Sequence, residues 1–470
     1  MTLINTLPDE VLLAIFEARL KIFDFGVGED PASKKSIEAW QSLVHVCRRW
    51  RSIVFGSPVR LNLQLVGTRK TPVRDTLDVW PPALPLVIYD FFPVCLTGSL
   101  DNTIALFEHS RRVCQIFMDV TILELEEVSA AMQVPFPELT DLQLTSCDEM
   151  AMAPVLPDSF LGSSAPRLRK LQLTSIPFPG LPRLLLSTTH LVELHLGYIP
   201  HAGYISPGTM VNALSTLINL ESFSLIFESP RSRPDAESRR PLPPTRSVLP
   251  VLTRFVFNGL SEYLEDFVAR IDTPLLNTLY VTPLDQFVFS TTPFFRFIDR
   301  TPMLKAFKKA RVCFDHKAAW VDISTTSDCG VLNMTVSCRG LEEQLLALGR
   351  VCASSLPSLT AAEDLYVEAP TFRPDWQDAQ DAQWLDLLRP FSAVKNLYLS
   401  KELPGVVLAL QEAVIRGTTV TVLPTLQNIF LEELHSSGPI QEVIGQFVAA
   451  REVTSHPITV SCWDRWKRGS

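Results

Sequence analysis

The stretch LTDLQL at residues 139–144 is one copy of an apolar-x-x-apolar-x-apolar pattern that decides the fold of this chain. The same spacing returns at residues 168–173 and 191–196, and eleven copies begin between residues 139 and 426. Their starting points lie 23 to 32 residues apart, so the pattern is a tandem repeat and not a chance match in a leucine-rich chain. The remaining copies begin at Leu220, Leu252, Leu276, Phe307, Val331, Ala362, Val394 and Leu426.

Each copy predicts a β-strand, because its last apolar residues alternate with polar ones. Segments between the strands have helical character, so each unit reads as strand, turn and helix. Since such a unit cannot bury its apolar side alone, stacked units predict an α/β solenoid with a parallel sheet on the concave face and helices on the convex face. The pattern and its length resemble leucine-rich repeats of a divergent type. The helical segments are 210–217, 262–270, 341–353 and 406–415.

Proline marks the beginnings of these strands. The chain has 36 prolines and only 19 glycines, and proline is tolerated at the first residue of a strand, where it ends whatever precedes it. Strand-like spacing also extends backwards to Leu61 and forwards to Val460, which places the solenoid at residues 61–470 with no linker after Pro58. The prolines that stand two residues before a repeat are Pro137, Pro166, Pro250, Pro274 and Pro424; the further strand positions are Leu61, Leu63, Leu86, Ile88, Val113, Ile116, Met118, Ile458 and Val460.

The first sixty residues have a different periodicity. Pro8 suits the first position of a helix, and Asp9 and Glu10 favour its N-terminal turn. Apolar residues then follow at helical spacing, first in residues 12–20 and again in residues 43–54, which predicts two amphipathic helices. The apolar residues are Leu12, Ile15, Phe16 and Leu20 in the first helix, and Leu43, Val46, Cys47, Trp50, Ile53 and Val54 in the second.

These residues resemble an F-box over roughly residues 3–62, with a connection longer than in compact F-boxes at about residues 21–39. The resemblance implies a helical module, residues 1–60, that docks on a Skp-family adaptor and through it on a cullin–RING ubiquitin ligase. The alternative is an ordinary helical pair that caps the solenoid. The Trp80-Pro81-Pro82 stretch adds a resemblance to the large F-box families of mushroom-forming fungi. By analogy the adaptor contacts are Leu7, Pro8, Leu12, Ile15, Phe16, Leu43, Val46, Trp50 and Ile53.

The positions between the core residues of each repeat face the open side of the predicted sheet. Their mixture of hydrogen-bonding and aromatic side chains suits a protein epitope, although any one of them could simply face solvent. Residues 229–247 form a Pro/Ser/Arg-rich insertion that cannot bury enough apolar surface to fold alone, and we expect a disordered loop there. The candidate target-binding residues are Asp141, Gln143, Lys170, Gln172, Glu193, His195, Arg254, Tyr280, Arg311 and Tyr398.

Composition excludes several other classes of protein. The net charge of −9 argues against a dedicated nucleic-acid binder, so we expect the basic residues at 48, 49 and 51 to form a solvated helix face. The nine cysteines are scattered singly, which predicts reduced thiols in the cytoplasm or nucleus and no zinc or redox site. The first residues lack the basic region of a secretory leader, and no apolar run has the length of a membrane helix.

No catalytic constellation is found. The nearest histidine group, His190, His195 and His201, lacks the helical i, i+4 spacing of a zinc-binding pair. We expect no cofactor, no metal and no enzymatic activity. The sequence therefore predicts the substrate-recognition subunit of a Skp–cullin–F-box type ubiquitin ligase. The rivals are a protein-interaction scaffold outside ubiquitin transfer, and an enzyme with an unrecognised site.

Overall fold

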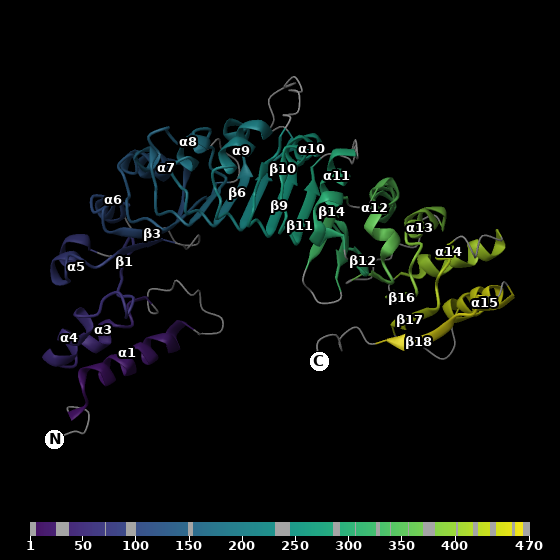
Figure 1. Ribbon diagram of the computed structural model, residues 1–470, viewed down its shortest axis with the longest axis horizontal. Coiled ribbons are helices and arrows are strands. Elements are labelled where there is room, and N and C mark those ends of the chain that lie inside the picture. Colours follow the sequence, from purple (N-terminus) through teal and green to yellow (C-terminus); the bar gives the residue numbers. More distant parts are fainter. Residues whose placement is uncertain are drawn as a thin grey trace. The chain divides into compact units, whose positions relative to one another are not determined.

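The computed structural model describes the chain as two compact units, residues 1–204 and 205–470, which are taken separately below. Figure 1 shows helices and strands alternating through both units. The residues described are 6–24, 37–70, 72–90, 100–148, 154–230, 245–284, 292–305, 307–325, 330–338, 340–355, 357–369, 381–400, 403–416, 422–432, 439–453 and 456–463.

Among the described residues, the first unit opens with the helices α1 (Asp9–Asp24), α3 (Gln41–Val44) and α4 (Arg48–Phe55). The prediction of a single second helix over residues 43–54 is wrong, because the helix is interrupted between α3 and α4. Cys47 there is extended, with φ −159°, and its Sγ accepts a hydrogen bond from the backbone N–H of Trp50 at 3.5 Å. This cap begins α4 afresh, while the apolar spacing runs through the break unchanged.

Six parallel strands follow in the first unit, paired in chain order. The predicted strand at Leu61 and Leu63 is wrong: both side chains are buried, but Leu61 lies in a turn, Leu63 follows that turn, and the first strand begins at Leu65. The strands are β1 (Leu65–Gly67), β2 (Leu86–Asp90), β3 (Val113–Val120), β4 (Asp141–Ser146), β5 (Lys170–Thr174) and β6 (Glu193–Ile199); the helices between them are α5 (Val73–Val79), α6 (Asp101–Phe107), α7 (Ile122–Ala131) and α8 (Leu181–Leu185).

The second unit continues the strand–helix alternation. Helices lie on one side of its strands and leave the opposite side open (Figure 1). Its strands are β7 (Ser222–Phe227), β8 (Ser247–Val248), β9 (Arg254–Gly259), β10 (Ile271–Asp272), β11 (Thr278–Pro283), β12 (Lys309–Phe314), β13 (Ala319–Ser324), β14 (Val331–Val336), β15 (Asp364–Glu368), β16 (Asn396–Leu399), β17 (Asn428–Glu432) and β18 (Thr459–Trp463). Its helices are α9 (Pro207–Leu214), α10 (Ser261–Ala269), α11 (Thr292–Arg300), α12 (Leu341–Ser355), α13 (Asp381–Leu388), α14 (Pro404–Ile415) and α15 (Pro439–Val453).

One part of the second unit departs from the predicted parallel order. The strands lie in the order β11-β14-β13-β12-β15, and β13 is antiparallel to both of its neighbours. The sequence copy that begins at Val331 lies on β14, which pairs parallel with β11, but its predicted register is wrong: Val331 pairs with Thr278, the third position of the preceding copy, and is only half-buried, while Leu332, Met334 and Val336 fill the core. Two adjacent strands joined by a short turn can only pair antiparallel, which the apolar spacing alone does not reveal.

The core confirms the predicted alternation within the repeats. Leu142, Leu171 and Leu194 stand opposite one another on neighbouring strands, and each is at most 1% exposed. Burying one such side chain stabilises a fold by roughly 1.5–3 kcal/mol. The residues between them alternate to the open face, so the solenoid presents its polar and aromatic side chains in rows.

Candidate functional site: a helical module and an open sheet face

The helical module exposes apolar side chains that the rest of the described chain does not cover. Val11 and Ile15 lie one turn apart on α1 and are 41% and 43% exposed, and Val46, in the break between α3 and α4, is 58% exposed. Pro8 is also exposed, while Leu7 and Trp50 are half-buried. Exposed apolar groups gathered on one small module are the kind of surface that a partner protein covers.

The other predicted adaptor contacts lie inside the module. Leu12, Phe16, Leu43 and Ile53 are each at most 9% exposed and form its core. The Phe16 ring packs against the Trp50 ring at a centroid distance of 4.7 Å. These buried residues hold the helices of the module together. A direct contact with an adaptor requires exposed side chains such as Ile15 and Val46.

The arginines of α4 bind the module together. The Arg49 guanidinium donates to the Asp9 carboxylate at 2.6 Å and also to the backbone carbonyl of Leu7, which ties α4 to the start of α1. Arg51 donates to the carbonyl of Val44 at 3.1 Å. Two of the three basic side chains are therefore engaged within the module and do not form a free basic stripe.

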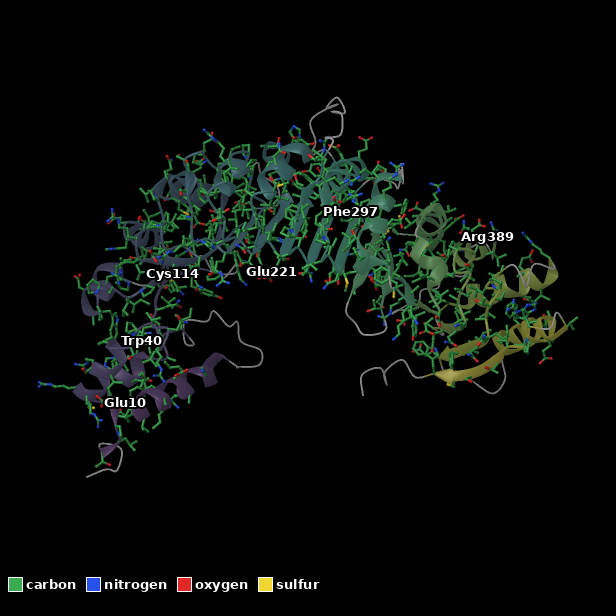
Figure 2. All side chains as sticks on the ribbon, viewed as in Figure 1. Glu10, Trp40, Cys114, Glu221, Phe297 and Arg389 are labelled. Carbon is green, nitrogen blue, oxygen red and sulfur yellow. The ribbon has the colours of Figure 1, made fainter. Side chains whose placement is uncertain are left out.

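An aromatic cluster joins the module to the first repeat. The Trp40 ring lies 5.1 Å from that of Trp80 and 6.0 Å from that of Phe55, all three edge-to-face. Trp40, labelled in Figure 2, donates its indole N–H to the carbonyl of Gln64 at 2.9 Å. Trp80 belongs to the Trp-Pro-Pro stretch of the sequence, so that stretch has a structural purpose here.

The module also covers the outer edge of the first strand. The Glu38 carboxylate accepts the backbone N–H of Val66 in β1 at 3.0 Å, beside the Trp40 contact. Side chains thus satisfy backbone groups that an uncovered edge strand would leave open to another chain. The module caps the solenoid, as one reading of the sequence expected, and still exposes Ile15 and Val46 for a partner.

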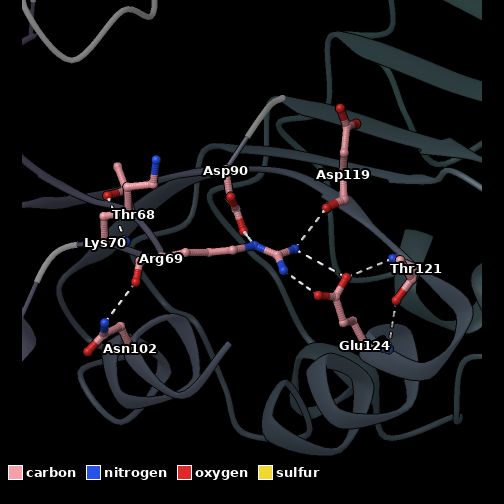
Figure 3. Close-up of polar contacts among 8 residues, drawn as sticks. All are labelled: Thr68, Arg69, Lys70, Asp90, Asn102, Asp119, Thr121 and Glu124. Atoms are coloured by element: carbon pink, nitrogen blue, oxygen red, sulfur yellow. Dashed lines mark hydrogen bonds and ion pairs between the residues drawn. The ribbon is translucent and has the colours of Figure 1, made fainter. Parts of the chain in front are cut away.

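A buried arginine fixes the first repeats to one another (Figure 3). Arg69 is 5% exposed and forms ion pairs with Asp90 on β2 and Glu124 on α7, and it donates to the carbonyl of Asp119 at 3.2 Å. Burial alone would lower the pKa of Arg69, but hydrogen bonds to the two carboxylates outweigh it and raise that pKa. Burial raises the pKa of Asp90, whereas the Arg69 bonds lower that of Glu124 against its own burial. Arg69, Asp90 and Glu124 pair with one another, so this cluster has a structural role.

The predicted target-binding residues of the first unit do come together on the open face. Asp141, Lys170 and Glu193 stand opposite one another on β4, β5 and β6, and the Lys170 ammonium pairs with the Glu193 carboxylate at 3.0 Å. The next row holds Gln143, Gln172 and His195. Partial burial lowers the pKa of His195 and favours its neutral form.

In the second unit the predicted residues fall into separate groups. The Arg254 guanidinium lies 5.2 Å from the centre of the Tyr280 ring on the neighbouring strand. Arg311 stands opposite Tyr366 and approaches the buried Glu368 carboxylate, with Nε 3.7 Å from Oε1. Tyr398 lies one strand beyond Tyr366.

The strongest feature of this face is a ring stack that was only partly predicted. Tyr366, Tyr398 and Phe430 stand opposite one another on β15, β16 and β17, and their rings stack with centroids 4.2 and 4.5 Å apart and planes within 15°. Trp463 on β18 meets the stack edge-on, 5.6 Å from Tyr398. The signal was present: an aromatic residue occupies the fifth position in three consecutive repeats.

A second ladder runs alongside the rings. Asn396 donates its amide to the Asp364 carboxylate at 2.7 Å, and Asn428 donates to Asn396 at the same distance. These residues share the third position of the same three repeats. The two ladders hold side chains of β15–β17 in fixed positions, which makes this region a preorganised surface.

The antiparallel strands add a half-buried carboxylate, that of Asp322, which sequence reasoning missed. Asp322 on β13 accepts the Asn333 amide at 2.6 Å and the Trp320 indole N–H at 3.1 Å. Burial raises the pKa of Asp322 despite these bonds. No pattern in the sequence placed this residue, because the predicted repeats did not include β13.

The remaining expectations concern chemistry and membranes. Within the described ranges, no group of three or more histidine, cysteine or acidic side chains is arranged to hold a metal ion. His190 and His201 are exposed and His195 lies on β6, apart from any such group. Across the same residues no helix has both the length and the apolar character needed to cross a bilayer. Most of the inserted loop, residues 231–244, lies outside the described residues.

Comparison with known proteins adds one family match. Residues 4–59 match the family model described as F-box-like. A leucine-rich repeat-containing protein, LegL7 from Legionella pneumophila, aligns over 82% of this chain and 97% of its own at 14% identity and a TM-score of 0.29; the fold assignment therefore rests on the repeat geometry above. No curated protein sequence matches the chain. An F-box-like domain followed by a leucine-rich-repeat solenoid is an architecture typical of non-catalytic interaction proteins, and this chain carries such a domain at residues 4–59.

Proposed function

We propose that this protein is the substrate-recognition subunit of a Skp–cullin–F-box type ubiquitin ligase, acting in the cytoplasm or nucleus. The module binds a Skp-family adaptor, and the open face of the solenoid binds a target protein. The protein performs no bond chemistry. It raises the effective concentration of a target lysine near the ligase's ubiquitin carrier.

One observation carries the adaptor half of this proposal. The part of the chain that matches the F-box-like model exposes Ile15 and Val46, while Trp40 and Glu38 contact the segment around β1. Some residues of the module therefore anchor it to the solenoid, and others are accessible to a partner. Apolar anchors of this kind supply most of the energy of helix-in-groove recognition.

The adaptor half is tested by mixing the full chain with a Skp-family adaptor and measuring complex formation by gel filtration and calorimetry. Ile15→Asp and Val46→Asp each place a charge on the exposed patch, and we expect each to weaken binding by about 2–4 kcal/mol. Leu123→Asp is the matched control, because Leu123 is 76% exposed on α7, away from the module. Unchanged adaptor binding in both patch variants, with a wild-type circular dichroism spectrum, would overturn the proposal.

The second candidate is a scaffold that binds the adaptor without directing ubiquitin transfer. The match to an F-box-like model supports adaptor binding equally well in both cases. Reconstitution with the cullin–RING enzymes separates them. Ubiquitin transfer to a protein held on the open face supports the receptor, whereas a stable adaptor complex with no transfer to any bound protein supports the scaffold.

A further inference from the structure

The open face over β15–β18 combines aromatic rings with carboxylates. These four strands direct Asp364, Glu368 and Glu432 to the face and no lysine or arginine. Glu368 is buried and is approached by Arg311 of the neighbouring β12 at 3.7 Å, which leaves Asp364 and Glu432 as the negative charges of the face. Lys395 lies beside the start of β16, but its ammonium is paired with the Glu363 carboxylate at 3.0 Å. The face therefore has the charge that complements a basic ligand.

The ring stack ends at an open position. Phe430 contacts one ring among the described residues, that of Tyr398, and the next strand places Ser461 opposite it. A serine is too small to cover an aromatic ring, so the outer face of Phe430 is left for another group. The face of an aromatic ring attracts a cation, with an energy of roughly 0.5–2 kcal/mol.

A carboxylate lies next to that position. Glu432 follows Phe430 by two residues on β17, so both side chains project to the same face. Its Oε2 atom is shielded from solvent and has no hydrogen-bond partner among the residues the structure describes. A shielded carboxylate oxygen without a donor is costly, and a cationic group would satisfy it.

Trp463 is the neighbour of Glu432 on the next strand. It stands opposite Glu432 in the β17–β18 register, yet its indole N–H donates to the carbonyl of Leu399 on β16 at 3.2 Å. The indole therefore crosses β17 and lies beside the ring stack. The arrangement provides a ring face, a carboxylate and an aromatic wall within one part of the sheet.

We propose that this face binds a basic segment of the target protein, with a lysine or arginine side chain placed over the outer face of Phe430 and its charge directed to Glu432. The inference rests on the proposed receptor function, since it names the chemistry of the target. It commits to one kind of partner, an extended peptide segment with net positive charge. The asparagine ladder alongside the rings supplies hydrogen-bonding groups for the backbone of such a segment.

The test uses the full chain without adaptor. Random twelve-residue peptides displayed on phage are selected on the wild-type protein and, in parallel, on Ser461→Phe. The substitution adds a fourth ring to the stack and covers Phe430 without removing any native contact of the core. We expect the wild-type protein to enrich peptides with net positive charge, and Ser461→Phe to lose that enrichment. Enrichment of acidic or uncharged peptides, or of none, would overturn the inference.

A synthetic, fluorescently labelled copy of an enriched peptide then gives affinities by anisotropy. We expect Glu432→Gln and Ser461→Phe each to weaken binding at least tenfold. Glu221→Gln is the control, because it changes the net charge equally at an exposed glutamate before β7 (Figure 2). Equal weakening by all three variants would show general attraction to an acidic protein and would also overturn the inference.

The two proposals fail separately. If the basic peptide does not bind while the adaptor complex forms normally, only the assignment of the target chemistry is wrong. If the peptide binds as expected and the adaptor complex does not form, the binding face stands and the receptor function is wrong.

Discussion

The fifth position of the repeat carries different chemistry in the two units. On β4–β6 it holds Gln143, Gln172 and His195, whereas on β15–β17 it holds three stacked aromatic rings. The backbone is the same in both places, a parallel strand with buried leucines on one side. The difference shows that the repeat fixes where a side chain points, while the residue at that position decides whether the surface is polar or aromatic.

The Arg69 ion-pair cluster of the first unit gives the largest expected effect. Arg69→Met leaves the half-buried Asp90 and Glu124 carboxylates without their cation, which costs about 3–5 kcal/mol of unfolding free energy. Urea unfolding of the full chain, followed by circular dichroism, measures the loss. Arg183→Met is the control, because Arg183 pairs with Asp158 at an exposed site and should cost at most about 1 kcal/mol. Similar losses in both variants would contradict the structural importance of the buried cluster.

Exchange of one residue on each face tests the comparison itself. Tyr398→Ala removes the middle ring of the stack, and we expect a selected basic peptide to bind at least about 2 kcal/mol more weakly. Gln172→Ala removes a side chain at the equivalent position of the polar face and should change the binding free energy by less than about 1 kcal/mol. Fluorescence anisotropy measures both. A larger effect of Gln172→Ala than of Tyr398→Ala would indicate that the peptide binds to the first unit.

A smaller effect is expected in the asparagine ladder. Asn428→Ala removes the hydrogen bond that its amide donates to Asn396 and the one that its Oδ1 accepts from Thr459, and the net value of each such hydrogen bond is about 0.5–1.5 kcal/mol. The loss should appear in urea unfolding and in slightly weaker peptide binding, because the ladder holds β16 and β17 in place. Gln427→Ala, at an exposed position just before β17, is the matched control. A neutral Asn428→Ala result would show that the ring stack alone orders this face.

The smallest effect is a pH dependence on the polar face. Burial lowers the pKa of His195 below its ordinary value of 6.5, so the folded state binds its proton less readily than the unfolded state does. Stability from this group is therefore complete above pH 6.5 and falls as pH drops below it. His195→Gln should reduce the loss of stability between pH 7 and pH 5, measured as the difference from wild type. An identical pH profile would contradict the assigned burial.

Most of the fold could be predicted because leucines at fixed spacing select one face of a strand. The repeats beginning at Leu139, Leu168 and Leu191 lie where the pattern placed them. The antiparallel strands could not be predicted, since period-two alternation is the same in either strand direction. The break at Cys47 was missed for a similar reason: the helical spacing continues across it, and a thiol acceptor leaves no strong sequence signal.

The candidate site was less accessible to sequence reasoning. Tyr398 was identified, but Tyr366 and Phe430 were not, although they occupy the same position in adjacent repeats. Reading across repeats instead of along each one would have found the stack. Glu432 and Trp463 could not have been placed, because their relation depends on an indole that crosses a whole strand. The split between exposed and buried residues of the module likewise depends on three-dimensional packing.

Hydrogen–deuterium exchange of the full chain tests the central claim most directly, with a Skp-family adaptor and a selected basic peptide added separately. The account predicts that the adaptor slows exchange in α1, α3 and α4 and leaves β15–β18 unchanged, and that the peptide does the reverse. Protection of β15–β18 by the adaptor, or no protection of the helical module, would contradict the assignment of the two surfaces.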